Sequence, residues 1–165
     1  MGKHGQSLED KFWESVQTTT DGSCWLWTEG QRVKGYGGIK HEGKRVYAHR
    51  VAYELLVGPI PEGMDIGHKC HDEAAAVGLC NNPVTCPHHA CCNPNHLKPE
   101  SRSVNLLASP LTQAAINKAK TKCKRGHEFT LENTRIKNVE KGWRSCITCD
   151  RMTKDERKEW DDAHA

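Results

Sequence analysis

His68-Lys-Cys70 and Cys91-Cys-Asn-Pro-Asn-His-Leu97 decide how this chain folds. Closely spaced cysteines and histidines are typical zinc ligands, and Cys91 and His96 are spaced to bind one ion together. Cys70 is a plausible third ligand. A closed tetrahedral site needs a fourth. Cys24 is a candidate from far upstream, although spacing alone does not select it.

A second pattern near the C-terminus predicts a separate zinc site. Cys123-x3-His127 is followed, after 18 residues, by Cys146-x2-Cys149. Each close pair can bind one edge of a tetrahedral ion, and the intervening loop can return the chain as a hairpin. Four protein ligands leave no open position, so we expect a structural zinc ribbon here and no catalysis.

The composition favours metals over disulfides as staples. The 165 residues include nine cysteines and ten histidines, but only 6% are aromatic and the mean hydropathy is -0.77. Nine is odd, so complete pairing would leave one thiol over. The N-terminus lacks an apolar secretory region, and no stretch reaches the ~20 apolar residues of a membrane span. We therefore expect a cytoplasmic protein without a membrane segment, whose reduced cysteines bind zinc.

The small net charge of +3 is unevenly distributed. Residues 117–151 contain ten Lys and Arg but four Asp and Glu. A basic segment of this kind faces phosphate or is simply a solvated surface, and charge alone favours neither. Because this one surrounds a zinc ribbon, nucleic acid is favoured over a purely protein partner.

Several motifs follow one another in the order found in phage-type HNH endonucleases. They are Cys24-Trp-Leu-Trp-Thr28, Gly35-Tyr-Gly37, Ala48-His-Arg50, Gly58-Pro-Ile-Pro-Glu-Gly63, His68-x-Cys70 and Cys91-x-Asn-Pro-x-His-Leu97. The last two also resemble the His-Cys box homing endonucleases, which share the ββα-metal (His-Me finger) fold. The C-terminal ribbon looks like the one often attached to phage HNH proteins.

The resemblance implies a role for individual residues. His68 matches the general base that activates water, a role that suits neutral imidazole. Asn105 matches the amide that holds a catalytic Mg²⁺ or Mn²⁺ ion. Asn93 matches the asparagine that fastens the loop facing His68. An arginine is expected at the scissile phosphate, and Arg45 and Arg50 are both candidates. The structural zinc ligands would be Cys24, Cys70, Cys91 and His96, although His96 could contact the catalytic ion instead.

The chain departs from the family pattern at two places. Many HNH proteins carry an Asp directly before the first histidine, but position 67 is Gly and the nearest carboxylate is Asp65. This difference favours the His-Cys box arrangement around Asn105. The loop between Cys70 and Cys91 is also long. It carries four residues that could bind a further zinc, namely His71, Cys80, Cys86 and His88. His89 or Cys92 could replace one of them, or the loop could be a polar surface with stray thiols.

These observations predict an α+β fold. We expect a small zinc-stapled ββα-metal endonuclease core with N-terminal antiparallel strands over residues 1–109, a helical connector over 110–121, and a zinc ribbon plus charged helix over 122–165. A hairpin within residues 35–50 could enter the DNA major groove. The candidate DNA-binding residues are Arg32, Lys34, Lys40, Lys44, Lys124, Arg125, Arg135, Lys137 and Arg144.

The predicted function is a metal-dependent endonuclease that cuts double-stranded DNA to 5′-phosphate and 3′-hydroxyl ends. Its cofactors would be two or three structural Zn²⁺ and one Mg²⁺ or Mn²⁺. The main alternative is a non-catalytic zinc-stapled DNA-binding protein, and a second is a zinc-dependent protein-interaction module. The sequence does not define the target DNA sequence or the biological role. It also leaves open whether the protein forms a homodimer and whether it nicks one strand or cuts both.

Overall fold

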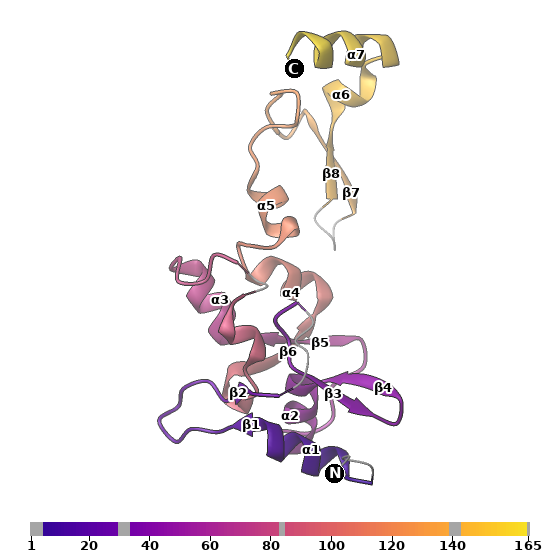
Figure 1. Ribbon diagram of the computed structural model, residues 1–165. Helices are drawn as coiled ribbons and strands as arrows, with labels where there is room; N and C mark the ends of the chain where they lie inside the picture. The colour runs from indigo at the N-terminus through magenta and orange to yellow at the C-terminus, as the bar shows by residue number, and fades with distance from the viewer. Residues whose placement is uncertain (1–4, 30–33, 83–84, 139–142, 165) are drawn as a thin grey trace. The chain divides into compact units, whose positions relative to one another are not determined.

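The computed structural model describes residues 5–29, 34–82, 85–138 and 143–164. The chain forms two compact units, Met1–Leu111 and Thr112–Ala165, each with its own internal contacts. Figure 1 shows the first unit in indigo to red tones and the second in orange to yellow. Within the described part of the chain, no helix is long and apolar enough to cross a membrane.

The first unit begins with short elements that build an N-terminal layer. Helix α1 (Leu8–Ser15) starts at a capping box, in which the Ser7 hydroxyl accepts from the Asp10 amide. Strands β1 (Val16–Gln17) and β2 (Leu26–Trp27) pair antiparallel. Strands β3 (Gly38–His41) and β4 (Lys44–Tyr47) form the expected hairpin, which leads directly into helix α2 (Ala48–Leu56).

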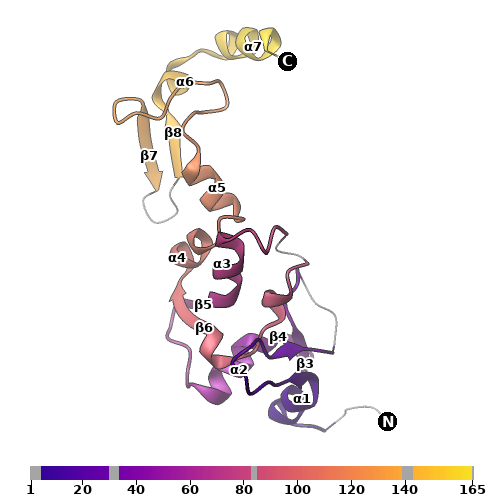
Figure 2. The ribbon, with the colours of Figure 1, turned by 90° about the vertical axis from the view of Figure 1, so that its left-hand side faces the viewer.

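A second strand pair and one helix form the centre of this unit. Strand β5 (Met64–His68) pairs antiparallel with β6 (Leu97–Ser101), in a register that places His68 opposite Leu97. Helix α4 (Arg102–Ala108) follows β6 and packs on both strands, as Figure 2 shows. Its cap is Ser101, whose hydroxyl accepts from the Val104 amide. The predicted ββα unit is therefore present.

The segment between β5 and β6 contains more helix than expected. The strand was predicted to continue to Cys70, but helix α3 (Lys69–Ala76) begins directly after His68. The run Asp72-Glu-Ala-Ala-Ala76 is rich in good helix formers, which explains the early start. Two 3₁₀ turns, η1 (Pro87–Ala90) and η2 (Pro94–His96), then lead into β6.

The hydrophobic core of the first unit is small and mixed. Its centre is formed by Phe12, Trp27, Ala48 and Ala52, with the Cys92 side chain packed among them. A separate small cluster contains Ala74, Ala75, Cys80 and Cys86. Small alanines and thiols bury little apolar area, so clusters of this size need additional staples.

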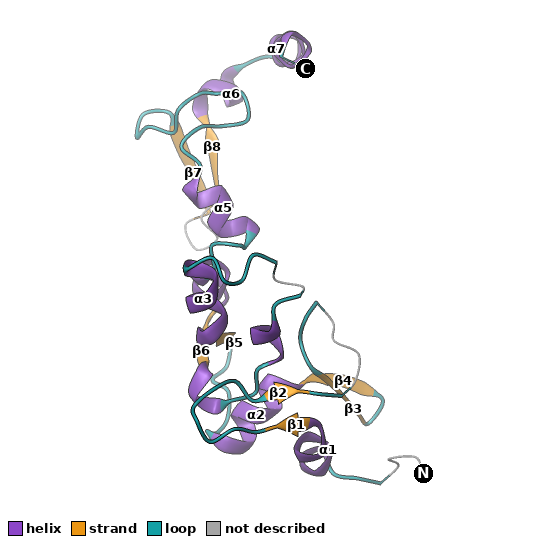
Figure 3. Ribbon diagram, turned by 60° about the vertical axis from the view of Figure 1, so that its left-hand side comes forward, coloured by secondary structure: helices purple, strands orange, loops and turns teal. Residues whose placement is uncertain are grey.

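The second unit consists of a hairpin flanked by helices. Helix α5 (Gln113–Ala119) is capped by Thr112 and not by Ser109. Strands β7 (Thr134–Asn138) and β8 (Trp143–Cys146) pair antiparallel, and the short helix α6 (Ile147–Arg151) follows. Helix α7 (Lys154–Ala163) begins at a capping box between Thr153 and Glu156. Figure 3, coloured by secondary structure, shows the short strands and the helices of both units. These elements confirm the predicted α+β class.

Candidate active site and metal centres

The first metal centre gathers four ligands from distant parts of the chain. The ligand atoms of Cys24, Cys70, Cys91 and His96 all lie within 4.8 Å of one another. Both the Cys24 and the Cys91 sulfur lie 3.5 Å from Nδ1 of His96. Ligand atoms of a tetrahedral zinc–thiolate site are ~3.8 Å apart, given Zn–S bonds of ~2.3 Å. The four side chains therefore fit a zinc ion. The fold brings Cys24 to this centre as the fourth ligand, an assignment that spacing in the sequence could not make.

The three thiols of this centre strongly affect one another. A hydrogen bond from Cys70 lowers the pKa of the Cys91 thiol to about 5, while burial and the neighbouring Cys91 charge raise the pKa of Cys24 to about 11. Three thiolates packed this closely repel one another. A bound cation would relieve the repulsion and deprotonate all three thiols.

The second centre lies in the segment between β5 and β6. His71, Cys80 and Cys86 are buried, and their ligand atoms lie within 4.8 Å of one another. Nδ1 of His88 lies 3.3 Å from the Cys86 sulfur, which adds the fourth expected residue at the edge of the group. Nε2 of His71 lies 3.2 Å from the Ser109 hydroxyl. A hydrogen bond on this nitrogen leaves Nδ1 oriented toward the thiols, as in many metal-bound histidines.

Of the two proposed substitutes for these ligands, Cys92 is buried in the main hydrophobic core. The His89 ring stacks on Tyr36, with ring centroids 4.6 Å apart, and also lies next to the His71 ring, with centroids 4.1 Å apart. The structure brings His71, Cys80 and Cys86 together, and it places His88 beside Cys86.

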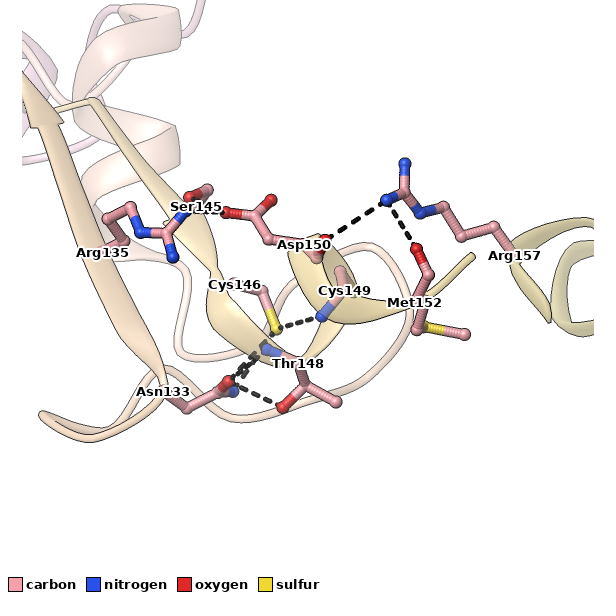
Figure 4. Close-up of polar contacts among 9 residues, drawn as sticks. All are labelled: Asn133, Arg135, Ser145, Cys146, Thr148, Cys149, Asp150, Met152 and Arg157. Atoms are coloured by element: carbon pink, nitrogen blue, oxygen red, sulfur yellow. Dashed lines mark hydrogen bonds and ion pairs between the residues drawn. The ribbon is translucent and has the colours of Figure 1, made fainter. Parts of the chain in front are cut away.

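The third centre is the ribbon of the second unit. The ligand atoms of Cys123, His127, Cys146 and Cys149 lie within 4.8 Å of one another. The Cys123 and Cys149 sulfurs are 3.6 Å apart. Figure 4 shows the Cys149 amide and the Asn133 side chain donating to the Cys146 sulfur, at 3.5 and 3.4 Å. Burial raises the pKa of Cys146, but these donors outweigh it and lower the pKa overall, which favours the thiolate that zinc binds.

His68 lies at the end of β5 and is 5% exposed. Its Nε2–H donates to the main-chain oxygen of Cys91, at 3.1 Å, so that Nδ1 carries the lone pair. Burial, assisted by the neighbouring His49 and His89, lowers the pKa of His68 well below its usual value. The geometry therefore holds a neutral imidazole with one nitrogen able to accept a proton.

Asn105 lies on α4 and faces the residue next to His68. Its Oδ1 is 3.4 Å from the position that a Cβ atom on Gly67 would occupy. The Glu100 carboxylate reaches the same place from β6. The structure thus brings Asn105 and Glu100 together over Gly67, the residue that precedes His68, and motif matching missed Glu100. No sequence motif marked this glutamate, because its burial is a property of the folded chain.

Asn93 fastens the loop that carries two ligands of the first centre. Its side chain donates to the main-chain oxygen of Ser23 at 2.8 Å, and its Oδ1 accepts from the Asn95 amide at 3.0 Å. These bonds connect the segment before Cys24 to the turn before His96. Asn93 is 2% exposed, so the contacts are protected from water.

The candidate phosphate-binding residues of the first unit differ in exposure. Arg45 on β4 is exposed, with its side chain lying over Gly38. Arg50 on α2 is half-buried, and its charge contributes to lowering the pKa of His49 to about 3, although burial is the larger cause. Lys34, Lys40 and Lys44 are exposed, whereas Arg32 lies outside the described residues.

In the second unit, some of the candidate basic residues make internal contacts. Arg125 forms an ion pair with Asp161 at 2.7 Å, and Arg135 pairs with Asp150 at 3.2 Å. Arg144 donates to main-chain oxygens of residues 117, 118 and 120 and lies over the Phe129 ring. Lys124 and Lys137 are exposed. A groove of about 490 Å³ beside the ribbon is lined by Lys120, Lys122, Lys124, Arg125 and Arg144, among others.

A ββα unit with a histidine at the strand end and an asparagine on the helix defines a nuclease-like class of site. Residues 46–76, which include His68, match the family model described as HNH endonuclease. The resemblance to HNH endonucleases drawn from the motifs is thereby confirmed.

Two proteins of Escherichia phage T7 are similar to the chain. Protein 2.8 is 31% identical over 105 residues, which cover 61% of this chain and 60% of the relative. Protein 7.7 is 45% identical over 47 residues, which cover 28% of this chain and 36% of the relative. The matches thus span less than two thirds of either relative. No solved structure matches the chain.

Proposed function

We propose that this protein is a metal-dependent DNA endonuclease in which His68 is the general base. The observation that carries the proposal is the position of the Asn105 amide over Gly67, directly before His68 in a segment that matches HNH endonucleases. Phosphodiester hydrolysis needs a base for water and a cation at the phosphate. The chain offers a neutral imidazole at residue 68 and an amide oxygen over residue 67.

The hydrogen bond of His68 to Cys91 determines which nitrogen reacts. Because Nε2–H donates to the carbonyl, Nδ1 is the atom that takes a proton from water. The activated water attacks phosphorus, and the products are 5′-phosphate and 3′-hydroxyl ends. The low pKa keeps the imidazole unprotonated at neutral pH, so that it is ready to act as a base.

Asn105 would hold the Mg²⁺ or Mn²⁺ ion, because an amide oxygen is a hard ligand that suits such cations. When bound, the ion would stabilise the negative charge that develops on the phosphate and the leaving 3′ oxygen. The three Cys/His clusters would hold zinc with a structural role. The first of them connects the loop of Cys91 to the segment before β2 and so positions the carbonyl that orients His68.

The substrate would be double-stranded DNA bound through phosphate contacts. Lys40 and Lys44 lie on the exposed β3–β4 hairpin, a β-ribbon of the kind that the major groove accepts. The basic groove of the ribbon unit offers a second contact surface. Either Arg45 or Arg50 would support the scissile phosphate. Because the two relatives are phage proteins, we place the activity in the cytosol of an infected bacterium.

A plasmid nicking assay with Mg²⁺ or Mn²⁺ tests this function. We expect the wild type to cut and His68→Ala to lose cutting while keeping its zinc content and DNA affinity. Equal cutting by His68→Ala would exclude His68 as the base. A wild type that binds DNA but never cuts, with either cation, would favour the non-catalytic zinc-stapled DNA-binding protein. Gel filtration of the wild type with and without DNA tests for a homodimer.

A further inference from the structure

Glu100 is a buried carboxylate that the proposed mechanism does not use. The residue lies on β6 and is 8% exposed. Its Oε2 pairs with the Lys98 ammonium at 3.0 Å, but its Oε1 is buried and has no hydrogen-bond partner among the residues that the structure describes. A buried carboxylate oxygen without a partner is costly, which indicates a ligand that completes the site.

The unpartnered oxygen points to the place where a side chain of residue 67 would be. A Cβ atom on Gly67 would collide with Oε1 of Glu100 and would lie 3.0 Å from its Cδ and 3.4 Å from Oδ1 of Asn105. Two oxygen ligands, one from β6 and one from α4, therefore converge over Gly67. His68 is the next residue along the chain, so the two oxygens lie over the backbone directly before the candidate base.

We propose that Glu100 is a second protein ligand of the divalent cation and replaces the aspartate that many HNH proteins carry directly before the first histidine. This inference rests on the proposed function. Divalent hard cations prefer oxygen ligands and bind commonly through one or two carboxylates. Gly67 is needed because any side chain there would displace the Glu100 carboxylate.

Side-chain contacts explain why Glu100, and not Asp65, takes this role. Asp65 lies opposite Glu100 in the β5–β6 pair. The Asp65 carboxylate lies 3.8 Å from the Arg102 guanidinium and is two residues from Gly67. Glu100, in contrast, reaches across the strand pair to Gly67 itself. Asp65 is thus the nearest carboxylate in sequence but not the one above Gly67.

An ion pair with Lys98 is the alternative explanation for the buried Glu100 carboxylate, and a variant of Lys98 can test it. Its ammonium lies between Glu100 and Asp72, 3.2 Å from the latter. Two carboxylates and one ammonium carry a net charge of about −1, so the group still attracts a cation. If Glu100 served only this ion pair, loss of Lys98 and loss of the Glu100 charge would have similar effects. If Glu100 binds a cation, loss of Lys98 would leave cation binding unchanged or tighter.

The first experiment measures Mn²⁺ binding directly, by the electron paramagnetic resonance signal of free Mn²⁺ during titration of the zinc-loaded full chain. We expect Glu100→Gln to weaken Mn²⁺ binding by roughly tenfold or more, as losses at metal sites commonly do. Zinc content and circular dichroism should stay unchanged. Lys98→Met is the matched control and should bind Mn²⁺ at least as tightly as the wild type.

A second pair of variants moves the carboxylate. Gly67→Asp alone should lose Mn²⁺ binding, because the new side chain collides with Glu100. Gly67→Asp combined with Glu100→Ala removes the collision and should recover binding to within severalfold of the wild type. Recovery would show that a carboxylate at this place is what the cation needs, and that Glu100→Gln had not simply misfolded.

Three results would overturn the inference. One is Mn²⁺ binding by Glu100→Gln as tight as in the wild type. The second is an equal loss of Mn²⁺ binding in Lys98→Met and Glu100→Gln. The third is no Mn²⁺ binding in the wild type. In each case the nicking assay with His68→Ala decides separately on the endonuclease, since cutting that depends on His68 could continue with Asn105 as the single protein ligand.

Discussion

Nε2 of His68 lies 3.1 Å from the main-chain oxygen of Cys91, so the candidate base is hydrogen-bonded to a residue of the first metal centre. The sulfur of Cys91 belongs to the cluster, and its carbonyl orients His68. A change in the metal centre can therefore reach the base through Cys91, and also along the chain from Cys70, which lies two residues after His68. The first prediction tests this connection.

Removing a ligand of the first centre should abolish cutting without touching His68. We expect Cys24→Ser to lower the zinc content by one ion per chain and to reduce the melting temperature, because a structural zinc contributes strongly to the stability of a small domain. Nicking should fall in parallel. Zinc analysis, thermal unfolding and the plasmid assay measure the three effects. Full activity in a Cys24→Ser protein that has lost one zinc would contradict the proposed link.

The second centre predicts the total zinc content. The wild type should contain about three zinc ions per chain, and Cys86→Ser should contain about two, since Cys86 lies 3.3 Å from both His71 and His88. Cys92→Ala is the matched control, because Cys92 is buried in the apolar core. It should keep all three ions. Elemental analysis of the three proteins distinguishes them, and two ions in the wild type would reject the third site.

The pH dependence of cutting should reflect the lowered pKa of His68. Burial first, and then the neighbouring histidines, disfavour the charged imidazolium, so the folded protein keeps the base neutral below the usual pKa of about 6.5. Activity is therefore retained as the pH falls through 6.5 and is lost only at lower pH. Single-turnover nicking between pH 5.5 and 8, with zinc content checked at each pH, measures this. A half-maximal rate near pH 6.5 would show an ordinary histidine.

DNA binding through the β3–β4 hairpin should depend on salt. Lys40 and Lys44 are exposed on this hairpin, and each phosphate contact that is lost reduces the slope of log affinity against log salt by about 1. We expect the double variant Lys40→Gln/Lys44→Gln to lower the slope of log affinity against log salt by about 2. Lys158→Gln on α7 removes an exposed charge that belongs neither to the hairpin nor to the lining of the basic groove, and it should leave the slope unchanged. Equal slopes for all three proteins would exclude the hairpin as a DNA contact.

Local spacing predicted much of the architecture. The hairpin of residues 38–47, the capped helices at both ends and the ribbon strands follow from turn residues, capping boxes and alternation, which act over a few residues. The early start of α3 was missed because its helix formers stood inside a Cys- and His-rich segment that read as a loop.

The sequence by itself determined the ribbon ligands and the order of the HNH motifs, since ligand pairs a few residues apart can bind one ion in only a few ways. Tertiary structure decided which distant thiol joins Cys91, because Cys24 is brought there by the pairing of β1 with β2 and by the bonds of Asn93. It also decided which carboxylate lies over Gly67. The register places Asp65 and Glu100 opposite each other, and the contacts made in the folded chain direct Asp65 toward Arg102 and Glu100 toward Gly67.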